Sequence, residues 1–137
     1  LLFQNPQKQF FEDSVYSEVA FSLRRLGFQE AESAQAVESA LRLCRVEHLA
    51  ERSPFTLSFG EQHRVALASV VAPNPEILLL DAPFSGLDFA QRYRILDIME
   101  RLRSGGTAII LASHAQLPEG EWAQRRLVLQ DGRLYES

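Results

Sequence analysis

The first half of the chain shows apolar residues at helical spacing. The predicted helices cover residues 14–26, 30–46 and 58–71. On the first of them, the expected apolar face comprises Val15, Val19, Leu23 and Leu26. Ser58 and Glu61 have the S-x-x-E spacing of a capping box, which marks the start of the third helix. Pro73 and Pro75 follow its end, so we expect the helical part to stop there.

The second half alternates between short apolar runs and one helical pattern. Residues 76–81 and 107–112 are continuous apolar runs, which are typical of buried strands covered on both faces. A helix predicted over residues 89–102 separates them, and this order predicts parallel pairing through a crossover helix. Ligands of such sheets bind at the carboxyl ends of the strands, where Asp81 and His114 should share one edge.

A hairpin is predicted near the end of the chain, because the pair Asp131-Gly132 separates two further short runs. The runs cover residues 127–130 and 133–135. The whole pattern therefore predicts an α/β fold with a helical part preceding it.

Composition narrows the class of protein. The chain has 137 residues, enough for a single core, and a formal net charge of −4 without a basic cluster, which argues against nucleic-acid binding. Cys44 is the single cysteine, so no disulfide can form within the chain, and its helical spacing predicts a small buried apolar side chain. No apolar run approaches the roughly 20 residues of a membrane span, so a membrane link is expected to go through a partner.

Four short segments, in this order and spacing, resemble the ABC ATPase family. They are Phe3-Gln4-Asn5-Pro6, Leu57-Ser58-Phe59-Gly60-Glu61, Ile77-Leu78-Leu79-Leu80-Asp81 continuing to Ser85-Gly86-Leu87-Asp88, and Ala112-Ser113-His114. Each alone is a weak signal, but together they run along nearly the whole chain. Residues 4–21 look most like the energy-coupling-factor and cobalt-type importer ATPases.

The resemblance implies a role for three polar residues. Gln4 matches the Q-loop glutamine, whose amide can bind a Mg²⁺-bound water or the attacking water; the alternative is a polar residue that ends a strand. Asp81 matches the Walker B aspartate, which can hold Mg²⁺ through its water shell. His114 matches the switch histidine, which can donate to a γ-phosphate oxygen, although a lone histidine is more often structural.

The resemblance also implies two nucleotide contacts across a dimer. Ser58, Gly60 and Glu61 match the signature motif, where a helix N-terminus faces the γ-phosphate held by the opposite subunit. Asp88 matches the D-loop, which links the two nucleotide sites, and it is equally suited to be a helix N-cap. Phe59 departs from the family, which has glycine there so that the backbone can approach the phosphate closely.

A second departure concerns the general base. The family places a glutamate directly after the Walker B aspartate, and this chain has Ala82, whose methyl group cannot accept a proton. The sequence also contains no G-x-x-x-x-G-K-[ST] segment, the P-loop that holds the phosphates. In the family this loop precedes the Q-loop. We therefore expect weak or no ATP binding by residues 1–137, and ATP with Mg²⁺ for the complete subunit.

The resemblance implies a partial P-loop NTPase (RecA-like) sheet core with an ABC-type helical subdomain, lacking the P-loop strand and helix. The expected parts are residues 1–11 (Q-loop strand end), 12–72 (helical subdomain with the signature helix) and 73–137 (second part of the nucleotide-binding core). The chain starts at Leu1 inside a strand-like run, so the natural N-terminus is expected elsewhere.

Three functions remain open at this point. The first is an ATP-binding subunit of an importer with a degenerate hydrolytic site, located in the cytoplasm at the membrane. Its partners would be a transmembrane subunit, docked through residues 10–52, and a second ATPase subunit, identical or different. The second is a non-catalytic interaction module that docks a membrane or ATPase partner and never handles nucleotide, which the missing P-loop, Ala82 and Phe59 favour. The third, a soluble ABC ATPase of DNA repair, would need a coiled-coil or zinc insertion that the sequence lacks.

Overall fold

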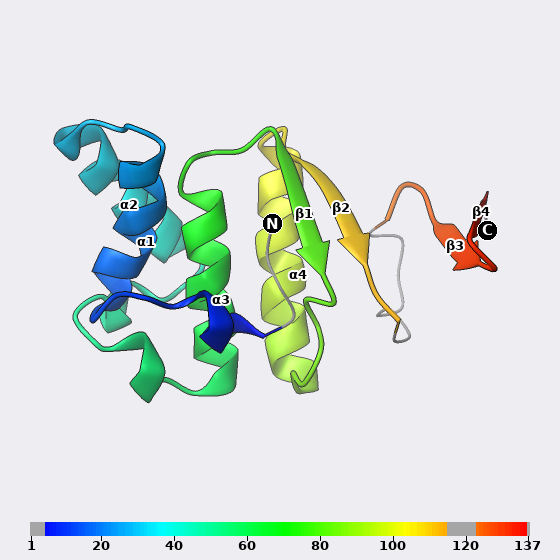
Figure 1. The fold of residues 1–137 in the computed structure, drawn as a ribbon, viewed down its shortest axis with the longest axis horizontal. Coiled ribbons are helices and arrows are strands. Elements are labelled where there is room, and N and C mark those ends of the chain that lie inside the picture. Colours follow the sequence, from blue (N-terminus) through cyan, green and yellow to red (C-terminus); the bar gives the residue numbers. More distant parts are fainter. Residues whose placement is uncertain (1–4, 115–122, 137) are drawn as a thin grey trace.

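The computed structural model describes residues 5–114 and 123–136. Helices come first and then a strand–helix–strand unit, as the sequence predicts (Figure 1). The helices are α1 (Val15–Arg25), α2 (Glu30–Leu43), α3 (Phe59–Val71) and α4 (Phe89–Ser104). The strands are β1 (Ile77–Asp81), β2 (Ala108–Ala112), β3 (Leu127–Gln130) and β4 (Arg133–Glu136). Three short 3-10 turns, η1 (Pro6–Gln9), η2 (Glu47–Leu49) and η3 (Pro54–Thr56), lie in the connections.

The helices α1, α2 and α3 pack together into the main core of the molecule (Figure 1). Their facing side chains are fully or almost fully buried, among them Val15, Val19, Leu23, Val37, Leu41, Val65 and Leu67. Leu26 was predicted on the same face but is 63% exposed, because α1 ends at Arg25 and the chain turns away at Gly27, whose φ is 84°. Cys44 is buried, as predicted, and burial raises the pKa of its thiol to about 12.

The second helix ends at Leu43, earlier than predicted, because the backbone turns out of the helix at Arg45. The φ angle of Arg45 is 55°, a left-handed conformation that a right-handed helix cannot continue. Arg64, on α3, satisfies the carbonyl groups left over at this end: its guanidinium donates to the Arg45 carbonyl oxygen at 2.8 Å and to that of Cys44 at 3.4 Å. The end of α2 is thus fixed by a side chain from another helix.

Strands β1 and β2 pair in parallel, as predicted, with Leu78 opposite Ile109 and Asp81 opposite Ala112. Helix α4 connects them and lies against one face of the pair (Figure 1). Its buried side chains are Ile95, Ile98, Met99 and Leu102. Leu78 and Leu80 point to this covered face and are buried.

The prediction that both strands are covered on both faces is wrong for the described residues. Ile77 is 60% and Ile110 is 61% exposed, and Leu79 between them is exposed too. The reason is geometric: side chains alternate between the two faces of a strand, and only the α4 face is covered here. The outward face therefore presents an apolar strip.

The hairpin β3–β4 is confirmed, with Leu127 opposite Glu136 and Gln130 opposite Arg133. Its turn residues, Asp131 and Gly132, have φ angles of 50° and 75°, the two positive values that a type I′ turn requires. All side chains of both strands are exposed.

Candidate functional site

The candidate site lies at the carboxyl edge of the β1–β2 pair. Asp81 is the last residue of β1, opposite Ala112 at the end of β2, and His114 follows two residues later. The prediction that Asp81 and His114 share one edge is therefore confirmed. Asp81 is exposed, on the same side of the pair as Ile77 and Leu79.

Ala82 is the residue at which the chain leaves the strand. Its N–H donates to the Ala112 carbonyl oxygen at 2.8 Å, which extends the pairing of β1 with β2 by one bond. Its φ angle is 46°, in the left-handed region that costs a residue with a side chain roughly 1–2 kcal/mol. The methyl group is buried, so the place predicted for a general base holds only a small apolar group.

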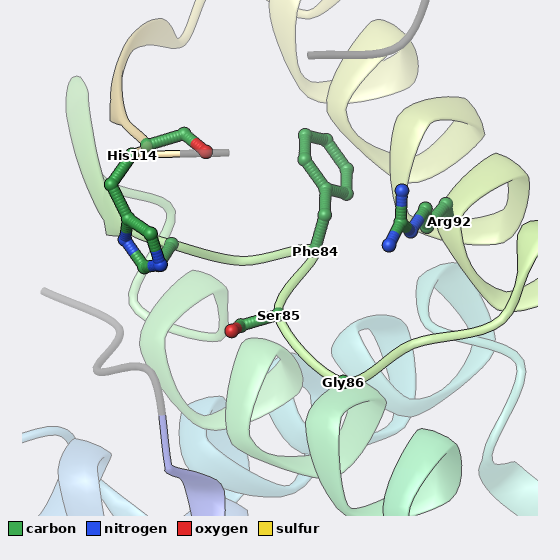
Figure 2. Close-up of a pocket in the computed structure, with 7 residues that line it drawn as sticks. Phe84, Ser85, Gly86, Arg92 and His114 are labelled. Carbon is green, nitrogen blue, oxygen red and sulfur yellow. The ribbon is translucent and has the colours of Figure 1, made fainter. Parts of the chain in front are cut away.

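A small pocket opens beside Ala82, with a volume of about 110 Å³. Its lining residues are Ala82, Phe84, Ser85, Gly86, Arg92, Ser113 and His114. Figure 2 shows His114 and Arg92 on opposite sides of Phe84, with Ser85 between them on the turn that follows. Among the described residues, the lining contains one guanidinium, one imidazole and two hydroxyl groups but no carboxylate. Such a set suits an anionic or polar group, and among these lining groups the His114 imidazole is the one that could act as a general base.

Residues 85–88, the turn predicted to match the D-loop, are held by short-range hydrogen bonds. The Ser85 N–H donates to the Ala82 carbonyl oxygen at 3.0 Å, and the Leu87 N–H donates to that of Phe84 at 3.3 Å. Arg92, one turn into α4, donates from its Nε to the Leu87 carbonyl oxygen at 3.0 Å. Hydrogen bonds therefore hold the turn both to the residues before it and to helix α4 after it.

Asp88 caps helix α4. Its Oδ1 accepts a hydrogen bond from the Gln91 N–H at 2.8 Å, so the N-cap alternative considered for Asp88 is confirmed. A contact of Asp88 with a second subunit stays a prediction.

The start of α3 is the capping box that the sequence predicts. The Glu61 carboxylate accepts from the Ser58 N–H at 2.9 Å and from the Ser58 hydroxyl at 2.8 Å, and the Glu61 N–H returns a bond to the Ser58 hydroxyl oxygen at 3.4 Å. The bond from the Ser58 backbone, and next the one from its side chain, lowers the pKa of Glu61. An ionised carboxylate therefore already lies at the helix end predicted to face a phosphate.

Gly60 lies where α3 approaches α4. A Cβ atom at this position would be 2.6 Å from the side-chain Cδ of Gln91, so a larger residue would displace that side chain. The sequence motif predicted a phosphate contact here. The structure shows an additional packing requirement, and the phosphate contact stays a prediction.

The predicted site residues form two groups. Ala82 and His114 line the pocket and Asp81 lies beside it, whereas Ser58 and Glu61 belong to the start of α3 and do not line it. Gln4 lies outside the described residues. Arg92 was missed by the sequence reasoning. The available signal was a basic residue one turn after the start of a predicted helix, the end at which acidic residues are favoured.

Neither a metal cluster nor a membrane span is found in the part of the chain that the structure describes. Residues 5–114 and 123–136 contain no group of three or more histidine, cysteine, aspartate or glutamate residues that could hold a metal ion. In the same ranges no helix is long and apolar enough to cross a membrane. Asp81 is a single carboxylate, and one carboxylate is compatible with Mg²⁺. This ion is usually held by one or two carboxylates together with phosphate oxygens of a nucleotide.

The chain is similar to ATP-binding proteins of transporters. Residues 4–117 match the family described as "AAA domain, putative AbiEii toxin, Type IV TA system". The nickel import ATP-binding protein LarO of Lactiplantibacillus plantarum is 50% identical over 114 residues, which are 83% of this chain and 47% of that protein. A putative ABC transporter ATP-binding protein of Caldanaerobacter subterraneus is 38% identical over 132 residues, 96% of this chain and 23% of that protein.

The chain is also similar to solved structures of ATP-binding proteins. CbiO1 from Clostridium perfringens, described as part of the ABC transporter complex CbiONQ, has a TM-score of 0.85 and 32% identity, over 98% of this chain and 54% of that one. A dimeric ATP-binding cassette in a post-hydrolysis state, bound to ADP and phosphate, has a TM-score of 0.77 at 23% identity, which supports the fold alone. The chain spans about half the length of LarO and of CbiO1.

Proposed function

Since the chain belongs to the ABC transporter ATP-binding proteins, we propose that it serves as the part of an importer's ATP-binding subunit that carries the signature helix and the Walker B edge, with a degenerate hydrolytic site. The observation that carries the proposal is the pocket at the carboxyl edge of β1 and β2, where Ala82 and His114 lie next to Asp81. Three of the four motifs, which are far apart in the sequence, lie at this edge and at the start of α3.

The degenerate character follows from the chemistry at Ala82. The described lining of the pocket offers no carboxylate to the water that would attack a γ-phosphate, and its polar groups are hydroxyl, imidazole and guanidinium. A general base typically contributes about 10²–10⁴-fold to a rate. The site would therefore bind and orient the terminal phosphate through His114 while hydrolysing slowly, and binding energy would drive closure of the dimer.

Mg²⁺ and ATP are the cofactors we propose for the complete subunit. Asp81 would hold Mg²⁺ through its water shell, with Gln4 as a second polar ligand of that shell. The metal neutralises phosphate charge when it is bound. The start of α3, which carries the Ser58 hydroxyl, would face nucleotide held by a second ATPase subunit.

A transmembrane subunit is the other proposed partner, on the cytoplasmic side of the membrane. The helical region of residues 10–52 would dock it, and Phe11, which is 72% exposed at the entry to α1, is a candidate contact. The similarity to CbiO1, which is itself part of a transporter complex, supports this assignment.

The test is to restore a base. We expect Ala82→Glu, made in a form of the subunit that includes the P-loop expected upstream, to raise ATP turnover by about 10²-fold or more. Ala90→Glu, at an exposed position of α4 outside the pocket, is the matched control and should leave turnover unchanged. An unchanged rate for Ala82→Glu in a folded protein would contradict our account of this residue.

A measurement of ATP binding separates the alternative function. If the longer subunit binds no ATP in equilibrium dialysis, the chain is a non-catalytic interaction module. That alternative is favoured by Ala82, in the place of the base, and by Phe59, in the place of a glycine.

A further inference from the structure

Phe59 has its ring against the 85–88 turn of its own chain. A Cβ atom placed on Gly86 would lie 2.8 Å from the ring carbon Cε1 of Phe59 and 3.4 Å from Cζ. Gly86 has a φ of 71°, so it needs to be glycine both for its backbone conformation and for the space that the ring fills. The side chain that replaces the family's glycine is therefore packed within the molecule, although 41% of the residue remains exposed.

The Phe59 ring also packs against a second aromatic side chain, that of His63. The Phe59 and His63 ring centroids are 4.6 Å apart with an interplanar angle of 67°, an edge-to-face arrangement. His63 is buried, and its Nδ1 lies 3.3 Å from the Phe59 carbonyl oxygen. The ring is thus held from two sides, by the next turn of α3 and by Gly86.

The backbone of α3 meets α4 next to this ring. Gly60 contacts the side chain of Gln91, and the N–H of Gln91 is bonded to the cap residue Asp88. The buried atoms His63 Nε2 and Gln91 Oε1 have no hydrogen-bond partner among the described residues. Neither atom therefore joins the start of α3 to the turn by a hydrogen bond, and the Phe59 ring supplies apolar packing between the two segments.

We infer that Phe59 is a positioning residue that fixes the 85–88 turn to the start of α3, so that the two predicted nucleotide-facing segments move as one unit. With glycine at position 59 the turn would lose this apolar contact and keep its short-range hydrogen bonds and the one from Arg92. The inference deepens the proposed function, because both segments belong to the dimer face proposed above. The contact itself is independent of nucleotide, so its test needs none.

The test is amide hydrogen exchange of the chain, followed by NMR at the Ser85 and Leu87 N–H groups. These two amides form the hydrogen bonds that close the turn. We expect Phe59→Ala to speed their exchange about tenfold while the amides of Val19 and Leu41 in the helical core stay as protected as before. Phe59→Leu, which keeps an apolar side chain in contact with Gly86, should restore most of the protection.

Phe55→Ala is the matched control. Phe55 is another exposed phenylalanine near the start of α3, but its ring packs on Phe10 instead of Gly86. It should leave the exchange of Ser85 and Leu87 unchanged. Equal exchange in Phe59→Ala and the unsubstituted chain would overturn the inference, and so would an acceleration of the turn by Phe55→Ala.

A double substitution gives a second, independent criterion. Gly86→Ala places a methyl group in conflict with the Phe59 ring, so it should destabilise the chain more than it does in the Phe59→Ala background, where only the backbone strain at position 86 remains. An equal loss in both backgrounds, measured by urea unfolding, would show that the ring does not hold the turn. A positive outcome here combined with no ATP binding by the longer subunit would leave the inference intact and reject the proposed function.

Discussion

The helical part, residues 5–72, and the α/β part, described over residues 73–114 and 123–136, differ in how completely they bury their apolar side chains. Helices α1, α2 and α3 cover one another, and their facing residues are sealed from solvent. In the α/β part the described residues cover one face of the β1–β2 pair, and Ile77 and Ile110 are exposed on the other. We therefore expect substitutions inside the helical part to cost more stability than substitutions on the open sheet face, whereas the pocket lies in the part that is less covered.

The largest effect is expected from removing a buried side chain of the helical part. Leu67 of α3 is fully buried, so Leu67→Ala should cost about 2–5 kcal/mol in the free energy of unfolding, through lost burial and the cavity left behind. Ile110→Ala, at the exposed sheet face, should change it by less than about 0.5 kcal/mol. Urea unfolding measures the free energy of unfolding of both variants. Similar losses for the two would contradict the difference between the helical part and the sheet face.

Arg64 should have the next largest effect. Its buried guanidinium satisfies the carbonyl oxygens of Cys44 and Arg45, so Arg64→Met should cost about 1.5–3 kcal/mol by removing charge-assisted hydrogen bonds. Arg42→Met is the control, because Arg42 has an exposed side chain and a 3.7 Å ion pair with Glu38 at the surface. Equal melting temperatures for the two variants would show that the end of α2 does not depend on Arg64.

The capping box should contribute less. Ser58→Ala removes the side-chain bonds at the start of α3 and should destabilise the chain by about 1 kcal/mol. Ser58→Asp, which restores a capping acceptor, should recover part of this, although its charge lies close to Glu61. A loss for Ser58→Ala that Ser58→Asp does not reduce at all would argue that Ser58 acts other than as a cap.

A pH effect is expected from His63. Burial lowers its pKa below the ordinary value of 6.5, because charging the ring inside the protein is unfavourable. The stability associated with the neutral ring is therefore present above pH 6.5 and is lost as the pH falls below it. Thermal unfolding between about pH 7 and about pH 5 should show a loss that His63→Gln reduces and that His48→Gln, at an exposed position, does not.

The smallest effect on stability is expected at the apolar strip of the sheet. Ile110→Lys should change the free energy of unfolding by less than about 0.5 kcal/mol, because the side chain is already 61% exposed. It should nevertheless reduce self-association measured by light scattering, since a charge on an exposed apolar strand disfavours sheet-to-sheet contact. If Ile110→Lys unfolds the chain, the strip is part of a core and the comparison is wrong.

The secondary-structure elements and their sequence along the chain were predictable from the amino-acid sequence. The helices, the parallel pair and the hairpin appear where the apolar spacing, the capping box of Ser58 and Glu61, and the Asp131-Gly132 turn place them. Asp81 and His114 were correctly placed on one edge, because the carboxyl ends of parallel strands coincide. These features depend on apolar periodicity and on turn residues, and both are set by residues that are only a few positions apart in the sequence.

Burial and long-range contacts were decided only by the tertiary structure. The apolar runs of β1 and β2 suggested coverage of both faces, but coverage depends on which other segments pack there, and a single strand's sequence does not contain that information. The end of α2 at Leu43 depends on Arg64 from another helix, the pocket includes Arg92, and the Phe59 ring lies on Gly86. The sequence by itself therefore determined the elements, the family resemblance and the missing base at Ala82, since all three depend on residue identity and local spacing. The partners of Phe59, Arg64 and Arg92 were fixed by folding, because residues distant in the chain meet only when the helices pack.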